Sequence, residues 1–276
     1  MQPISNRQHS SGFTIVELLV ALPLVVMVLG VFVASLITAF RTTNVSKVQL
    51  DLNNAAVLAL NTMERNVRYS NNYTTGITAP YTDPYGPSNT DGTWTGTWSY
   101  KGDSATNRVV ILKSYATTEN IFSPTRKTVY NDDLAYDCSA TGTLYLNSQL
   151  PYYTIFFVNN QTLYRRIITD NNTTAVCNGP QYQKQTCPNG ATRVARCKAN
   201  DEVVATNVTS FSIDYFVQRD TPTPTFDQIT DAYSSTDPTI LDGADDAVIN
   251  LTLSKQIAAE PVTATFSLRM SKVNGR

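Results

Sequence analysis

The sequence is short of charge, and its positive and negative charges nearly balance. Asp, Glu, Lys and Arg make up 16% of the 276 residues, and the formal net charge is -1. A protein that binds nucleic acid through its phosphates needs a surplus of Lys and Arg. The composition therefore supports no nucleic-acid partner. Hydrophobic residues, at 42%, are frequent enough to form a folded core.

Histidine and metal-binding cysteine pairs are also scarce. The only histidine is His9, and no two of the four cysteines form a Cys-x-x-Cys pair. Structural zinc sites are built from cysteine and histidine at such spacings. We therefore expect no zinc, and the sequence indicates no other cofactor.

One long apolar run dominates the N-terminal region. Residues 13–40 carry a single charge, that of Glu17. As a helix, this run would be about 42 Å long, which exceeds the ~30 Å hydrocarbon core of a bilayer. A secretory signal places its small cleavage-site residue after the apolar run. Here a polar segment, residues 1–12, ends in Gly12 before the run begins.

The stretch GFTIVELLVAL, residues 12–22, resembles the processing signal of type IV prepilins and type II secretion pseudopilins. The resemblance implies that a prepilin peptidase cuts between Gly12 and Phe13 and methylates the new N-terminus at Phe13. It also makes Glu17 the acid at mature position five. Two positions depart from the family pattern: Ser11 stands where Lys or Arg is frequent, and Pro23 comes earlier than the usual proline.

Glu17 also stands out on physical grounds. A carboxylate in hydrocarbon costs at least ~2.5 kcal/mol on insertion scales, so it usually has a partner or a function. Cleavage would create a cationic amine at Phe13, about 6 Å away along the helix axis. In a filament, the Glu17 of one subunit could then meet the Phe13 amine of its neighbour. The alternative is that Glu17 lies at the headgroup boundary and has no function.

The helix is expected to continue past the membrane, through residues 41–70. A kink is expected at Pro23, which lacks a backbone donor, and a looser turn near Gly30. Hydrophobic residues at steps of three and four predict that one side of this second half covers a head domain. These residues are Val45, Val48, Leu52, Ala55, Ala59, Met63 and Val67.

After residue 70, the spacing of the hydrophobic residues changes from a helical period to alternation with polar residues, which predicts an antiparallel sheet. A hairpin is expected in residues 152–167, with Asn159 and Asn160 as its turn. Together with the helix, this predicts an α+β, pilin-like fold with a β-rich head in residues 71–276. The strand pattern also resembles the heads of W-type minor pilins and J-type pseudopilins. The other expected strands are residues 107–115, 143–147, 208–216, 247–254 and 263–270.

Two long segments, residues 71–102 and 218–246, are rich in Pro, Gly, Asn and Asp and are expected to be loops. The first contains several large aromatic residues. They either form contact anchors at an interface or attach the loop to the sheet, and we favour attachment. The residues are Tyr81, Tyr85, Trp94, Trp98 and Tyr100.

Four cysteines in an exported head imply disulfides. Four cysteines allow three pairings, and the sequence alone does not decide among them. Our expectation is that Cys138 pairs with Cys177 and that Cys187 pairs with Cys197.

The sequence favours a protein that is not an enzyme. His9 would be removed with residues 1–12, so the mature chain would lack the base of a Ser-His or Cys-His nucleophile. The acidic clusters lie in loop-like stretches where acids are ordinarily solvated. Residues 242–247, DGADDA, offer oxygen ligands for calcium but lack the EF-hand spacing. The clustered acids are Asp132, Asp133, Asp137, Asp242, Asp245 and Asp246.

Two functions remain open from the sequence. The first is a minor pilin or pseudopilin that is anchored in a prokaryotic cytoplasmic membrane, is processed, and joins or starts an extracellular filament with other pilin subunits. The second is a membrane-anchored ectodomain, lectin-like or hydrolytic, that uses the helix only as a tether. A tether needs neither Gly12-Phe13 nor Glu17, so the first is favoured. Any surface ligand, and the choice between pilus and secretion system, stays open.

Overall fold

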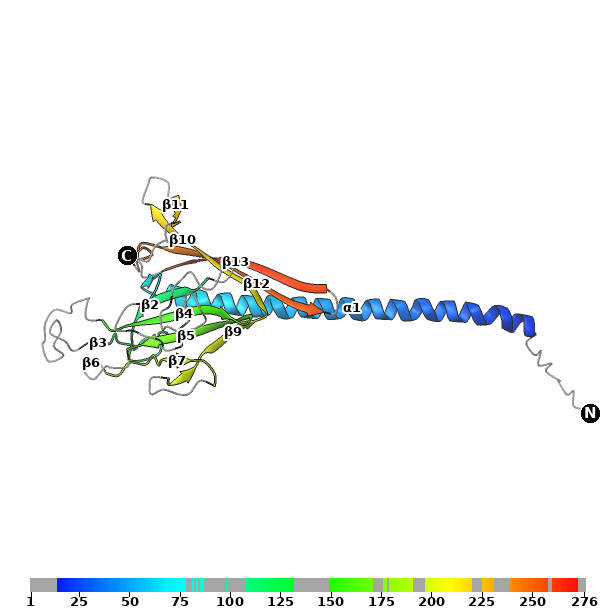
Figure 1. Ribbon diagram of the computed structural model, residues 1–276, viewed down its shortest axis with the longest axis horizontal. Coiled ribbons are helices and arrows are strands. Elements are labelled where there is room, and N and C mark those ends of the chain that lie inside the picture. The colour runs from blue at the N-terminus through cyan, green and yellow to red at the C-terminus, as the bar shows by residue number, and fades with distance from the viewer. Residues whose placement is uncertain are drawn as a thin grey trace, which may run out of the picture. The chain divides into compact units, whose positions relative to one another are not determined.

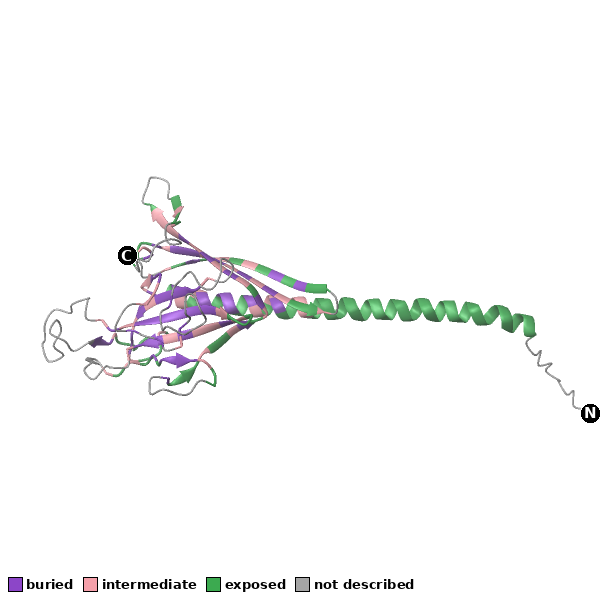
Figure 2. Ribbon diagram, viewed as in Figure 1, coloured by how far each residue is buried: buried purple, intermediate pink, exposed green. Residues whose placement is uncertain are grey.

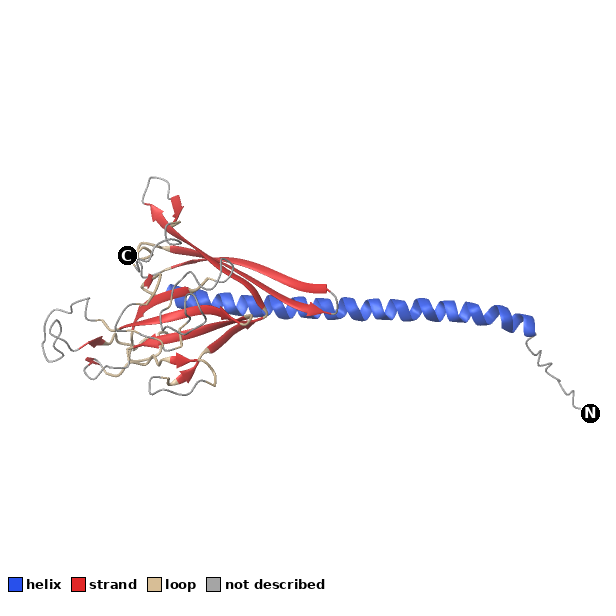
Figure 3. Ribbon diagram, in the orientation of Figure 1, coloured by secondary structure: helices blue, strands red, loops and turns tan. Residues whose placement is uncertain are grey.

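The protein divides into two compact units, Met1–Val48 and Gln49–Arg276, and one helix, α1 (Ile15–Arg68), runs through both. Figure 3 shows that, among the residues that the structure describes, the other regular elements are strands. The computed structural model describes residues 14–77, 81, 83, 85, 86, 98, 108–131, 149–170, 176, 177, 179–190, 197–219, 225–230, 239–257 and 260–272.

In the first unit, α1 is exposed on all sides, and through Phe40 it is also apolar on all sides. Every residue from 14 to 47 is exposed, as the uniform green of Figure 2 shows. The helix is continuous through Pro23 and Gly30, so the kink at these two residues stays a prediction. Its hydroxyls bond to carbonyls one turn back, as Thr38 does to Ala34 O at 2.9 Å. Such bonds satisfy polar groups without water, which a lipid environment requires.

In the second unit, α1 is buried on one side only. Four of the seven residues in the expected stripe are buried, and three are not. Val48 and Ala55 are only partly buried, and Val45 is exposed. Ala56 and Leu60, which do not belong to the expected stripe, are buried. The buried side is therefore rotated slightly from the one that the sequence predicts. It consists of Leu52, Ala56, Ala59, Leu60, Met63 and Val67.

The first sheet of the second unit has five antiparallel strands in the order β1-β2-β4-β5-β9. β4 is its central strand, and six consecutive residues of β4 are buried because both faces of the sheet are covered. Figure 1 shows β2, β4, β5 and β9 in green to yellow-green beside the second half of α1. The strands are β1 (Asn72–Tyr73), β2 (Val110–Tyr115), β4 (Pro151–Asn159), β5 (Thr162–Thr169) and β9 (Glu202–Thr206).

The second sheet has four antiparallel strands in the order β11-β10-β12-β13. Its long strands alternate between buried and less buried residues. Phe266, Leu268 and Met270 share one face of β13, as the sequence predicts. The strands are β10 (Val208–Arg219), β11 (Thr225–Gln228), β12 (Asp246–Ile257) and β13 (Glu260–Ser271).

The α+β fold class is confirmed: one long N-terminal helix precedes antiparallel sheets. The division of the long strands between two sheets is not evident from the sequence. Two further pairs are short. β3 (Tyr130–Asn131) pairs with β6 (Val176–Cys177), and β7 (Thr186–Cys187) pairs in parallel with β8 (Ala199–Asn200). The strand expected in residues 143–147 lies outside the described residues.

The hairpin of β4 and β5 turns one residue later than expected. Asn159 is still paired with Thr162, so the two-residue loop is Asn160-Gln161. Both loop residues have positive φ, 48° and 57°. A type I′ turn requires this at both positions, and Asn tolerates it well. Gln is unusual at the second position of such a turn. The sequence therefore favoured Asn159-Asn160 as the loop over the actual Asn160-Gln161.

Aromatic residues from the first long loop pack against one face of the first sheet. Tyr81 contacts Tyr153 edge to face, with ring centroids 5.1 Å apart, and Trp98 packs on Phe157 at 4.7 Å. Tyr81 and Trp98 are both buried. For these two residues the structure supports attachment of the loop to the sheet. Trp94 and Tyr100 lie outside the described residues.

A buried arginine lies within the same aromatic layer. Arg166 of β5 is 1% exposed, and its guanidinium pairs with Asp83 at 2.7 Å and Asp201 at 2.6 Å. It also donates to Tyr85 O at 2.8 Å and lies over the Trp98 ring. Hydrogen bonding and charge attraction from both aspartates outweigh burial and raise the pKa of Arg166. The ion cluster therefore joins three distant parts of the chain.

Replacing Arg166 by Met should strongly destabilise the head. The change leaves the carboxylates of Asp83 and Asp201 buried without a counter-ion, which typically costs about 3–5 kcal/mol. Urea denaturation of the full chain in micelles, followed by tryptophan fluorescence, measures the free energy of unfolding.

Arg68→Met is the matched control. Arg68 pairs with Glu64 on the exposed side of α1, and such pairs contribute about 0.5 kcal/mol or less. If the two variants lost the same amount of unfolding free energy, the stabilising role of the buried ion cluster would be contradicted.

Candidate functional site

The N-terminus of α1 holds Glu17 in a capping box. Thr14 precedes the helix, and its hydroxyl accepts a hydrogen bond from Glu17 N at 3.3 Å. In return, Glu17 Oε2 accepts from Thr14 N and from Thr14 Oγ1, both at 3.0 Å. Leu18 N donates to Thr14 O at 3.1 Å, which is the first bond of the helix ladder. Thr14-Ile15-Val16-Glu17 is thus a Thr-x-x-Glu cap.

This cap gives Glu17 a partner within its own chain. Its carboxylate faces the start of the backbone rather than the flank of the helix, because it bonds to Thr14 N. The helix dipole also favours a negative charge at this end. Gly12 and Phe13 lie outside the described residues, so the cleavage site itself stays a prediction.

The Thr-x-x-Glu spacing of this cap is visible in the sequence, although Glu17 stands out there first as a charge in an apolar run. The pattern of a threonine three residues before an acid, directly ahead of an apolar run, is the usual signature of a helix start.

A disulfide joins Cys187 and Cys197, one of the two expected pairs, with Cα atoms 5.6 Å apart. The disulfide is connected to the buried ion cluster through Asp201, because Asp201 N donates a hydrogen bond to Cys187 O at 2.8 Å. Thr186 Oγ1 also donates to Asp201 Oδ1 at 2.9 Å. Cys138 and the side chain of Cys177 lie outside the described part of the chain, so their pairing stays a prediction.

The acids near the end of the second long loop have structural partners. Asp245 accepts from Gln218 N at 3.0 Å, and Asp246 accepts from Arg269 Nη2 at 2.6 Å. Among the described residues, no group of three or more His, Cys, Asp or Glu side chains is arranged to hold a metal ion. Asp132, Asp133 and Asp137 lie outside the described residues.

Comparison with known proteins adds little to this picture. No family model and no curated protein matches the sequence. Among solved structures, a type IV-like pilin from Thermus thermophilus aligns with 81% of this chain and 96% of its own length. The identity is 9% and the TM-score is 0.35. A likeness at this level does not establish a family or a function.

Replacing Thr14 by Val should loosen the first turn of α1. Valine keeps the side-chain shape but cannot accept from Glu17 N, and loss of such a cap costs about 0.5–2 kcal/mol. Amide hydrogen exchange at Glu17, measured by NMR in micelles, should become about 2- to 30-fold faster. Thr14→Ser keeps the hydroxyl and should exchange like the parent. Equal exchange in the valine variant would contradict the cap.

Proposed function

We propose that this protein is a minor subunit of a type IV pilus or a related filament, and that it takes part in filament initiation or tip assembly. A prepilin peptidase cuts between Gly12 and Phe13, and Phe13 becomes the methylated N-terminus. Residues 13–40 anchor the chain in the cytoplasmic membrane and later join the filament core. The head lies outside the cell, and the protein acts as a structural subunit rather than an enzyme.

One observation carries this proposal: Gly12-Phe13 and Glu17 stand together at the very start of an apolar helix that is exposed on all sides. By length and composition this helix can cross a membrane. A plain tether would need the apolar helix but not the glycine or the acid. A signal peptide would need neither Glu17 nor the continuation of the helix to Arg68.

The capping box supports a specific role for Glu17. Its carboxylate already lies at Thr14 N, one residue from the place where cleavage would create an amine. The acid is therefore positioned to attract an amine, either its own or that of an adjacent subunit whose helix is staggered along the axis. In hydrocarbon this attraction is much stronger than in water.

Cleavage after Gly12 can be tested by co-expression with a prepilin peptidase. The product should begin at Phe13 and carry one added methyl group, as measured by intact mass and N-terminal peptide mass. Gly12→Leu should block cleavage, because a bulky side chain crowds the scissile bond, and should leave membrane insertion intact.

Gly30→Leu is the control for this experiment. It places the same side chain in the same helix, at a position where an added Cβ meets nothing within 4 Å. This variant should be processed like the parent. A product that starts at any residue other than Phe13 would contradict the proposal.

Glu17→Ala should separate insertion from assembly. Removing the charge lowers the cost of insertion, so the amount in the membrane fraction should not fall, whereas incorporation into filaments should. The measurement compares the protein in membranes with that in sheared filaments, or counts filaments per cell if the subunit acts only in initiation. Glu17→Gln should be intermediate, because the amide accepts hydrogen bonds but does not attract a cation.

Glu64→Ala is the matched control, since it removes an acid from the same helix outside the apolar run. The Glu64→Ala variant loses the ion pair between Glu64 and Arg68 on the surface of α1. This variant should assemble normally. If both Glu17 variants also support assembly as well as the parent does, Glu17 has no part in subunit pairing.

A further inference from the structure

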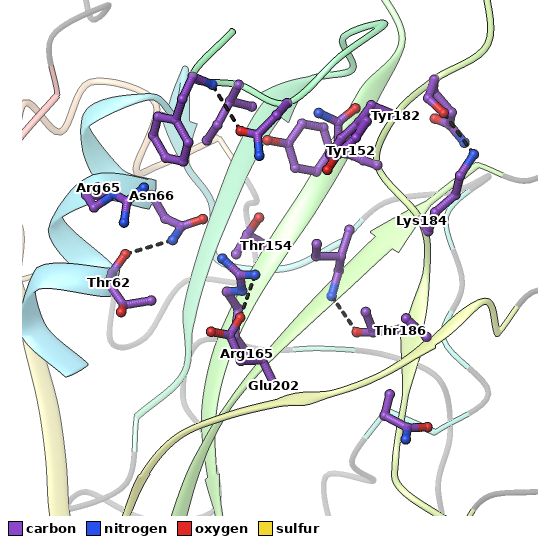
Figure 4. A pocket seen from close by; sticks show the side chains of 18 of the residues that line it. Thr62, Arg65, Asn66, Tyr152, Thr154, Arg165, Tyr182, Lys184, Thr186 and Glu202 are labelled. Carbon is purple, nitrogen blue, oxygen red and sulfur yellow. Dashed lines mark hydrogen bonds and ion pairs between the residues drawn. The ribbon is translucent and has the colours of Figure 1, made fainter. Parts of the chain in front are cut away.

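The head contains a cavity of about 880 Å³ between α1 and the first sheet. Thr62, Arg65 and Asn66 of α1 form one side of it, and residues of β4 and β5 form its floor. The segment from 180 to 186 forms the opposite side, as Figure 4 shows for Tyr182, Lys184 and Thr186. Sites for small ligands usually measure roughly 300–1,000 Å³. The cavity is thus large enough for roughly two or three sugar rings.

The floor carries several polar side chains. Arg165 of β5 pairs with Glu202 of β9 at 2.5 Å, and the two side chains are 28% and 48% exposed. Tyr152 of β4 is buried, and burial raises the pKa of its phenol above the ordinary value. Thr154 lies beside it. Hydroxyl, amide and guanidinium groups of this kind form hydrogen bonds with sugar hydroxyls and carboxylates.

The walls carry an excess of positive charge. Arg165 is balanced by Glu202, but Arg65 and Lys184 have no carboxylate partner among the described residues. Arg65 lies over the Phe122 ring at 4.3 Å, and Lys184 Nζ donates to Gln181 O at 3.0 Å. The two cations come from opposite sides of the cavity (Figure 4). This charge pattern suits a ligand that carries more than one carboxylate.

An aromatic ring is exposed beside this charge. Tyr182 is 51% exposed, although its backbone is fixed by a bond from Tyr182 N to Thr117 O at 2.7 Å. A solvent-exposed ring on a fixed backbone provides a flat apolar face, and a tyrosine side chain has few torsions to order when a ligand binds. The faces of sugar rings, which present C–H groups, pack on such surfaces. Amides from Asn66, Asn120 and Gln183 also line the cavity.

We propose that this cavity binds a segment of an acidic polysaccharide that has a carboxylate on successive sugar rings. Arg65 and Lys184 bind the carboxylates, Tyr182 packs on a ring, and the floor bonds to hydroxyls. The inference rests on the proposed function in that it gives an exported filament subunit a surface ligand. Its test needs no filament, so its failure would leave the assembly role standing.

The probe is trigalacturonic acid, added to the full chain in micelles of a detergent without a sugar headgroup. Isothermal titration calorimetry should detect binding that weakens about ten-fold or more when salt rises from about 0.05 to 0.5 M, because the ion pairs are partly exposed. Maltotriose, a neutral trisaccharide, should bind at least about ten-fold more weakly. A tripeptide of glutamate should also bind more weakly, since it offers charges without sugar rings.

Variants assign the binding to this cavity. Arg65→Gln and Lys184→Gln should each weaken trigalacturonate binding about ten-fold. Tyr182→Ala should weaken the binding of both trigalacturonate and maltotriose. All three residues are exposed, so the unfolding midpoint should not change. Lys255→Gln, which removes an exposed cation from β12 of the second sheet, is the charge-matched control and should bind like the parent.

Several outcomes would overturn the proposal. They are no binding of trigalacturonate up to about 10 mM, equal binding of maltotriose, equal binding of the glutamate peptide, or binding that the cavity variants leave unchanged. If no saccharide binds and the Arg65 and Lys184 variants reduce filament incorporation, the cavity is filled by a neighbouring subunit instead.

Discussion

The first half of α1 has an apolar surface that no other part of the described chain covers, and the rest of the molecule depends on this constraint. Side chains from Ile15 to Phe40 are almost all hydrophobic and are exposed to the surroundings. At roughly 25 cal/mol per Å² of apolar surface, such a helix cannot remain in water alone. Lipid or the apolar surface of other proteins can cover it. Under the proposed function, the helix exchanges lipid for the helices of other subunits, which are similarly apolar surroundings, at little net cost.

Beyond Val48, the same helix becomes the structural support of a head. Its buried side includes Ala56 and Ala59, whose small side chains let other elements approach closely, and Met63, which fills irregular space. The two sheets meet near its end, where the Tyr73 and Tyr215 rings contact edge to face at 5.0 Å. One helix therefore has two kinds of surroundings along its length, and the change from all-round exposure to one-sided burial marks the boundary between them.

The sequence predicted the long elements well, because their periods are strong. The helix and strands β2, β4, β5, β10, β12 and β13 follow from apolar spacing alone. The two-residue strands and the division into two sheets depend on contacts between distant residues, which local periodicity does not contain. Arg166 is the clearest case. It follows Arg165 directly, yet only Arg166 is buried, and its partners are 83 and 35 residues away. The Glu17 cap, by contrast, was predictable from its spacing.

The bond between Trp98 Nε1 and Asp83 Oδ2, 2.8 Å long, has a consequence for how this head can diverge. Both residues are buried and bound to the Arg166 cluster, so the chain enters and leaves the intervening segment at a fixed point on the sheet. The entropic cost of closing a loop rises only slowly with its length. Insertions or deletions between Gly86 and Trp98 should therefore be tolerated by the fold. New surface features can be added in this segment without redesigning the core.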